Sequence, residues 1–78
     1  MTLLLGENLI SLRHRNHITQ EVLANKLQVS TSAIAMYESG YRLPRLDKLI
    51  RIGAIFNVSL DELVGYRVDP KREQGVIQ

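Results

Sequence analysis

Seven basic side chains in the middle of the chain could bind a polyanion. Between residues 13 and 51 the sequence has Arg13, Arg15, Lys26, Arg42, Arg45, Lys48 and Arg51, against three acids, Glu21, Glu38 and Asp47. This stretch is clearly basic, although the formal net charge of the whole chain is only +2. Such a surface fits a polyanion such as nucleic acid. An ordinary solvated surface explains the same charges equally well.

Other residue types that carry chemistry do not assemble into a recognisable site. His14 and His17 have a spacing that can hold a metal on a helix, but no Cys or acid cluster completes the set. We therefore expect exposed histidines rather than metal ligands. The sequence contains no Ser/His/Asp constellation, phosphate-binding loop or paired carboxylates. It predicts neither an enzyme, nor a metal site, nor a cofactor.

Length and composition predict one small globular domain. The chain has 78 residues, of which 45% are hydrophobic and none is cysteine. Without disulfides, the composition fits a reducing compartment, and we expect a cytoplasmic location. The start "MTLLLGENL" has no basic region and a short apolar run, so we predict neither a signal peptide nor a membrane partner.

Apolar residues at helical spacing predict a compact all-α bundle of five short helices. The first carries Leu5, Leu9 and Leu12, ends near Arg15 and could be capped by Thr2. Its Gly6 weakens the helix by about 1 kcal/mol relative to Ala.

The second and third predicted helices are short and joined by a tight turn. Thr19 caps the second, whose inner face carries Leu23, Ala24 and Leu27. Ser30 caps the third, Ile34 and Tyr37 point inward, and Gly40 ends it. Three or four connecting residues are the spacing of a helix-turn-helix unit.

The remaining residues predict two more helices and a tail. A helix over 46–56 should turn Leu46, Leu49, Ile50 and Phe56 inward, and Asn57 suits the left-handed residue that follows it. Ser59 caps a fifth helix through Val64, which Gly65 stops. We divide the chain into a domain at 1–65 and a polar C-terminal tail at 66–78.

The stretch "TQEVLANKLQVSTSAIAMYESGYRLP" resembles the phage-repressor (Cro/repressor-like, XRE) helix-turn-helix family, and the resemblance covers about residues 3 to 65. The matching positions are Thr19, Gln20, Leu23, Ala24, Val29, Ser30, Ile34, Tyr37, Glu38, Gly40, Arg42 and Pro44. "FNVSLDEL" and "LRHRN" match further family segments. The resemblance implies a lambda-repressor-like fold. It also implies that the protein is a transcriptional regulator that binds specific sequences of double-stranded DNA, and we expect it to act as a repressor.

Phosphate contacts follow from the same resemblance. Gln20 matches a glutamine that donates to a DNA phosphate beside a helix N-terminus. Thr19 and Ser30 mainly serve as helix caps, and their hydroxyls are additional candidate donors to phosphates. Arg42 and Arg45 flank Pro44 in a loop that lies along the DNA backbone in the family, where each could neutralise one phosphate. Lys48 and Arg51 are expected on the solvated helix face.

Base contacts would come from the outward side of the third helix, about residues 31–38, which the family places in the major groove. That side should present Thr31, Ser32, Ala35 and Met36, with Ser39 marginal. Hydroxyls bond to several base edges, and methyl and thioether groups pack on thymine methyls. We therefore expect a modest, thymine-leaning specificity, with DNA shape contributing.

Two further features follow from comparison with the family pattern. Arg13 and Glu38 match a partly buried structural bridge between the first and third helices. The family often has glycine where this chain has His17, Gln28 and Asn57, so the turn at Gln28 should be strained or locally different. Gly53 replaces the usual alanine, which points to close packing or to simple drift.

Relatives dimerise on two half-sites, so a homodimer is one expected partner. Spare apolar surface for it includes Ile10, Val22, Leu3 and "GVIQ". Two other functions stay open. One is the DNA-binding antitoxin of a toxin–antitoxin pair, with a cognate protein partner. The other is a protein-interaction module on the same fold.

Overall fold

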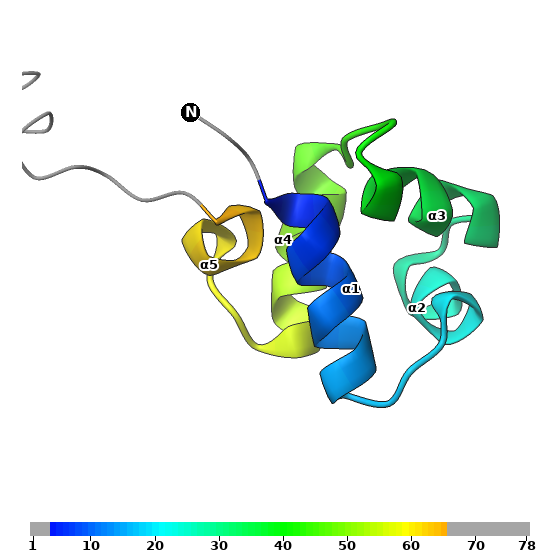
Figure 1. Ribbon diagram of the computed structural model, residues 1–78, viewed down its shortest axis with the longest axis horizontal. Helices are drawn as coiled ribbons and strands as arrows, with labels where there is room; N and C mark the ends of the chain where they lie inside the picture. Colours follow the sequence, from blue (N-terminus) through cyan, green and yellow to red (C-terminus); the bar gives the residue numbers. More distant parts are fainter. Residues whose placement is uncertain (1–3, 66–78) are drawn as a thin grey trace, which may run out of the picture.

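The computed structural model describes residues 4–65, which form five α-helices around one core (Figure 1). The helices are α1 (Leu5–Arg15), α2 (Gln20–Leu27), α3 (Thr31–Ser39), α4 (Leu46–Phe56) and α5 (Leu60–Val64). No strand occurs between residues 4 and 65, and the predicted all-α, five-helix fold is confirmed. The expected cap Thr2 and the tail at 66–78 lie outside the described residues. The residue that precedes α1 is Leu4.

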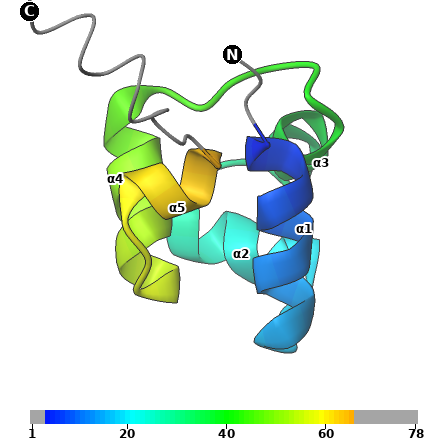
Figure 2. The same cartoon turned by 60° about the vertical axis from the view of Figure 1, so that its left-hand side comes forward.

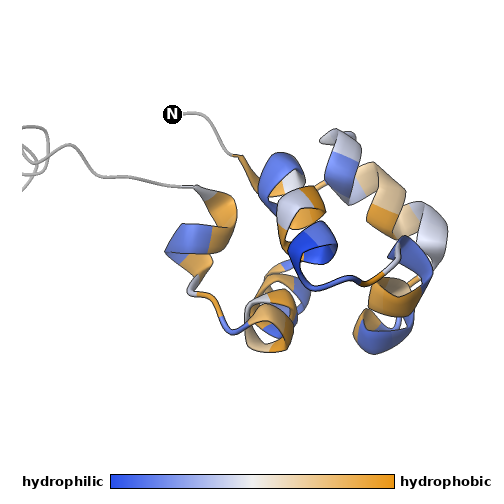
Figure 3. Cartoon of the chain, turned by 60° about the horizontal axis from the view of Figure 1, so that its bottom comes forward, coloured by the Kyte–Doolittle hydropathy of each residue, from blue (hydrophilic) through white to orange (hydrophobic). Residues whose placement is uncertain are grey.

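The central helix is α1, which contacts α3 on one side and α5 on the other, while α2 packs against α3 and α4 (Figures 1 and 2). Apolar residues, whose ribbon is orange in Figure 3, supply the core. Its buried members are Leu5, Leu9, Leu12, Leu23, Ala24, Leu27, Ala33, Ile34, Tyr37, Ile52 and Leu63. No helix in the described range is long and apolar enough to span a membrane.

Side-chain caps begin three of the helices, as their sequences predict. The hydroxyl oxygens of Thr19, Ser30 and Ser59 accept from backbone N–H groups at 3.1, 3.0 and 3.1 Å. Each bond satisfies a donor that the first helical turn leaves without a partner. Left-handed glycines end α3 and α5, at Gly40 (φ 79°) and Gly65 (φ 72°).

The inward face of α4 differs from the predicted one. Leu46 and Ile50, both expected in the core, are 64% and 55% exposed, whereas Ile52 is fully buried. The prediction was wrong because apolar residues cover more than half of the circumference of this helix. Periodicity cannot choose among them, and the choice is made by α2 and α5, which pack against one side of α4.

Three non-glycine residues have left-handed backbones, at the positions where the family often has glycine. They are His17 (φ 56°), Gln28 (φ 59°) and Asn57 (φ 57°). A β-carbon crowds the following carbonyl in this conformation, at a cost of about 1–2 kcal/mol that Asn relieves more readily than Gln. The turn between α2 and α3 therefore passes through a left-handed backbone at Gln28 and carries strain there.

Two helix glycines permit close backbone approaches. An added Cβ at Gly6 would overlap the carbonyl oxygen of Glu38, in the last turn of α3, and lie 3.1 Å from that of Tyr37. A Cβ at Gly53 would lie 2.9 Å from the carbonyl oxygen of Val58. Both glycines therefore serve packing, and the interpretation of Gly53 as simple drift is not needed.

The start of α1 and the end of α5 are joined by hydrogen bonds. The Leu4 N–H donates to the Val64 carbonyl at 2.9 Å. The Asn8 side-chain amide donates to the carbonyls of Glu62 and Leu63 at 3.2 and 3.0 Å. These carbonyls lie in the last turn of α5, where no intrahelical donor is available to them. Asn8 thus acts as a C-terminal cap supplied by another helix.

Candidate nucleic-acid interface

The turn between α2 and α3 is short and anchored at both sides. Gln28 reverses the chain, and the Val29 N–H then donates to the Ala24 carbonyl at 3.0 Å. On α3, Ile34 and Tyr37 are buried, as the sequence predicts. The two helices are thereby fixed against each other as a helix-turn-helix unit, and the opposite side of α3 faces outward.

The outward side of α3 carries small polar and apolar groups. Thr31, Ser32 and Ala35 are exposed, and Met36 is half-buried. The Ser39 hydroxyl donates to the Met36 carbonyl at 3.1 Å. The face therefore offers two free hydroxyls, a methyl group and part of a thioether, which can meet base edges and thymine methyls but cannot form a bidentate bond to a base.

An ion pair holds α3 against α1. Arg13 Nε lies 2.8 Å from Glu38 Oε2, and the side chains are only 13% and 6% exposed. Further bonds run from Arg13 to Glu38 Oε1 at 3.3 Å and to the Ile18 carbonyl at 3.2 Å. The arginine is thus satisfied by a carboxylate and a carbonyl, as a buried charge requires.

Gln20 joins the same carboxylate. Its Nε2 donates to Glu38 Oε1 at 2.9 Å, and the side chain is half-buried. One amide hydrogen is occupied by this bond, and the second remains free to donate at the N-terminus of α2. The family resemblance predicts the Arg13–Glu38 bridge but not the contact with Gln20. A carboxylate has enough lone pairs to accept this additional hydrogen bond.

The hydroxyls of Thr19 and Ser30 lie at the N-termini of α2 and α3. Both residues are exposed, and both oxygens accept a capping bond. Each hydroxyl hydrogen can still donate outward. Together with the free amides of the first turns, these groups create two small regions that favour an anion.

Arg42 and Arg45 lie in the connection between α3 and α4. Both are exposed, and among residues 4–65 neither forms an ion pair. The connection itself is held in place, since the Arg42 N–H donates to the Met36 carbonyl at 3.3 Å and Pro44 is buried. Two guanidinium groups are therefore presented to solvent from a fixed loop next to α3.

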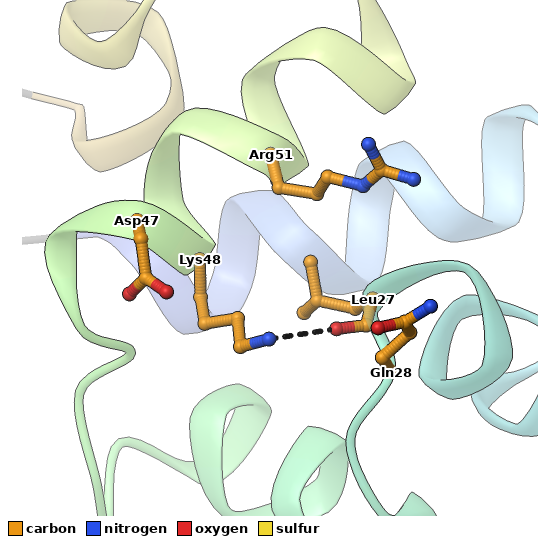
Figure 4. Close-up of a pocket in the computed structure, with 5 residues that line it drawn as sticks. All are labelled: Leu27, Gln28, Asp47, Lys48 and Arg51. Carbon is orange, nitrogen blue, oxygen red and sulfur yellow. Dashed lines mark hydrogen bonds between the residues drawn. The ribbon is translucent and has the colours of Figure 1, made fainter.

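Lys48 has a structural contact that sequence reasoning missed. Its Nζ donates to the Leu27 carbonyl at 3.1 Å, across a hollow of about 290 Å³ between α2 and α4 (Figure 4). The hollow is lined by Leu27, Gln28, Asp47, Lys48 and Arg51. A cation here stabilises the C-terminus of α2 and satisfies a free carbonyl. Arg51 is exposed, as predicted.

The two histidines lie at the end of α1 and in the connection that follows it. His14 and His17 are both exposed. No group of three or more His, Cys, Asp or Glu side chains within the part of the chain that the structure describes could hold a metal ion.

Comparison with known proteins identifies similar chains. Residues 9–63 match the family HTH_3, described as helix-turn-helix. The chain is 43% identical over 59 residues to the HTH-type transcriptional activator BcrR of Enterococcus faecalis, covering 76% of this chain and 29% of that protein. It is 34% identical over 59 residues to the cryptic phage CTXphi transcriptional repressor RstR of Vibrio cholerae, covering 76% of this chain and 53% of RstR. The chain thus spans about half or less of the length of these relatives.

The fold is shared with a solved structure. A transcriptional regulator from Listeria innocua superimposes with a TM-score of 0.84 at 33% identity, covering 99% of this chain and 76% of the other.

Proposed function

This chain belongs to the HTH_3 helix-turn-helix family, and on that premise we propose that it is a sequence-specific, double-stranded DNA-binding transcriptional regulator. The third helix enters the major groove with Thr31, Ser32, Ala35 and Met36 against the bases. Gln20, Arg42 and Arg45, with the caps Thr19 and Ser30, contact phosphates. We further propose that the chain represses transcription, as the phage repressor RstR does by its name. It would do so without catalysis and in the cytoplasm.

One observation carries this proposal. The exposed side of α3 is free of charged side chains, while the caps Thr19 and Ser30, at the N-termini of α2 and α3, are exposed. The guanidinium groups of Arg42 and Arg45, in the connection after α3, have no ion-pair partner among residues 4–65. Such an arrangement fits a duplex, whose phosphates flank a groove that the uncharged helix can enter. Affinity for DNA then comes from the contacts to phosphates on both sides of the groove, and sequence specificity comes from α3.

Binding selection on random duplexes, at two salt concentrations, tests this function. We expect an enriched sequence and an affinity that falls steeply as salt rises, since phosphate contacts release counterions. Absence of both an enriched site and a salt slope would overturn the DNA-binding function. It would favour a protein-interaction module, whereas co-purification of a toxin with a DNA-bound chain would favour an antitoxin.

A further inference from the structure

The connection between α1 and α2 carries a histidine whose side chain the fold does not use. His17 is exposed, and its backbone is left-handed (φ 56°) at a position where the family often has glycine. The side-chain hydrogen bonds around it run from Arg13 and Asn16 and do not involve the imidazole. The described residues, 4–65, give it no ion pair either. A histidine therefore stands here although a glycine would serve the turn more easily.

Hydrogen bonds fix the backbone at His17 in place. The His17 N–H donates to the His14 carbonyl at 3.1 Å, and the Ile18 N–H donates to the Arg13 carbonyl at 3.0 Å. The Arg13 guanidinium donates in turn to the Ile18 carbonyl at 3.2 Å. The imidazole is therefore carried by a held turn that joins the end of α1 to the start of α2 (Figure 1).

This turn is next to one of the proposed phosphate contacts. Thr19, two residues after His17, is the N-cap of α2, and Gln20 is the first residue of that helix. Two residues separate their Cα atoms by at most about 7 Å. An imidazole at position 17 is therefore within a side chain's length of the phosphate that Thr19 and Gln20 would contact.

The charged and titratable groups near His17 come from the two helices that the turn joins and from α3. They are Arg13, His14 and Arg15 in the last turn of α1, Glu21 in the first turn of α2, and Glu38 of α3. Arg13 and Glu38 neutralise each other at 2.8 Å. Glu21 is exposed and forms no ion pair with His17. The imidazole is therefore available to an anion that a partner brings.

We propose that His17 is a further phosphate contact of the DNA-binding surface and that its imidazole takes up a proton when DNA binds. Histidine is the side chain that changes charge between pH 5 and 8. A phosphate beside it favours the charged form, which donates from both ring nitrogens. DNA affinity therefore rises as the pH falls. The other proposed contacts cannot cause this, because amide, hydroxyl and guanidinium groups keep their charge across that range.

This role of His17 rests on the proposed function, because the phosphate belongs to DNA. The two can nevertheless be told apart. A chain that binds no duplex at any pH would overturn the proposed function and the role of His17 with it. A chain that binds an enriched sequence with a salt slope, but with the same affinity at every pH, would overturn the role of His17 alone.

Titration of the full chain with the enriched duplex, at constant salt and between about pH 5.5 and pH 7.5, tests the proposal. We expect the wild type to bind about tenfold more tightly at the lower pH. His17→Asn should remove most of this dependence, because asparagine accepts the left-handed backbone and does not titrate. The matched control is His14→Asn, which removes the exposed histidine in the last turn of α1 and should retain the dependence. Equal losses in the two variants would contradict the assignment to His17.

Lysine at the same position provides the converse test. His17→Lys keeps a positive charge over the whole range, so it should bind with little dependence on pH and about as tightly as the wild type does at low pH. The salt slope of the wild type should be steeper by about 0.9 at the lower pH, and that of His17→Lys should stay constant. A His17→Lys variant as pH-dependent as the wild type would mean that another group takes up the proton, and would overturn the proposal.

The imidazole can also be observed directly. The chain has two histidines, so His14→Asn leaves His17 as the only imidazole in an NMR spectrum. Adding duplex at about pH 7 should move the ring resonances toward those of the protonated form. Resonances that stay in place while the variant binds DNA would show that His17 lies away from the phosphates, and would overturn the contact.

Discussion

Gln20 and Arg13 share one carboxylate, with Gln20 Nε2 2.9 Å from Glu38 Oε1 and Arg13 Nε 2.8 Å from Glu38 Oε2. A residue at the start of α2 is thereby tied to α3 and, through it, to α1. The amide that would reach a phosphate is held in one orientation before DNA arrives. The Gln20 side chain therefore loses little conformational entropy when it binds DNA.

We predict that Glu38→Gln destabilises the fold by about 3 kcal/mol, because it leaves the largely buried Arg13 without its counter-charge. Urea unfolding measures the loss. Glu21→Gln removes an exposed carboxylate from the adjacent helix and should change stability by less than about 0.5 kcal/mol. Similar losses in the two variants would mean that the ion pair contributes little.

We predict that Gln20→Ala weakens DNA binding about tenfold for all sequences alike, since it removes one hydrogen bond to a phosphate. The salt slope should stay unchanged, because glutamine carries no charge. Titrations of preferred and scrambled duplexes at several salt concentrations separate these effects. An unchanged affinity would show that the Gln20 amide serves only Glu38.

Arg42→Ala should weaken binding to every sequence and lower the salt slope by about 0.9, the value of one phosphate contact. Arg15→Ala, which removes an exposed arginine outside the proposed contacts, should leave the slope unaltered. Equal changes from both variants would indicate a diffuse charge effect.

Thr31→Ala should instead shift the preference at particular base pairs, because its hydroxyl bonds to a base edge. Repeating the binding selection with this variant measures the shift. If the variant merely loses affinity uniformly, as we expect for Arg42→Ala, then the division into base and phosphate contacts is wrong.

Gln28→Gly should stabilise the chain by about 1 kcal/mol by relieving the left-handed backbone at the turn. Asn57→Gly should gain less, because asparagine tolerates this conformation better. Thermal unfolding compares the two variants, and Gln28→Ala, which retains a β-carbon, is the control. A gain from Gln28→Ala as large as that from Gln28→Gly would exclude backbone strain as the cause.

Gly6→Ala should destabilise the chain by about 2 kcal/mol, although helix propensity alone predicts a gain of about 1 kcal/mol. The new methyl group would meet the Glu38 carbonyl. Ser11→Ala, at an exposed position of α1, isolates the propensity effect. A stabilised Gly6→Ala variant would mean that α1 and α3 separate readily.

Local signals predicted the ends of the helices, because a cap is formed within a few residues. Thr19, Ser30 and Ser59 each bond to an N–H three residues ahead. The buried side of α4 depends on distant neighbours, and there the prediction of Leu46 and Ile50 as core residues was wrong. Apolar residues around a helix indicate that it packs, without indicating how many of its sides are covered.

In the candidate interface, too, local features could be predicted and contacts between distant residues could not. Helical periodicity alone identified the outward side of α3, since its inward anchors Ile34 and Tyr37 are well defined. The links that hold the interface in place could not be read from the sequence. Gln20–Glu38 and Lys48–Leu27 join residues that are 18 and 21 positions apart, and no local pattern records which donor a distant acceptor will meet.

The first and last described residues of the bundle lie side by side, because the start of α1 is hydrogen-bonded to the end of α5. A Cβ at Gly65 would lie 2.9 Å from Leu4 Cβ, so the described chain enters and leaves at nearly one point, beside α5 and across α1 from α3 (Figure 1). Extra sequence can be attached at either end without threading past the helix-turn-helix unit. This chain spans 29% and 53% of two of its relatives, and further sequence attached at these ends would lie away from the helices that we propose to face DNA.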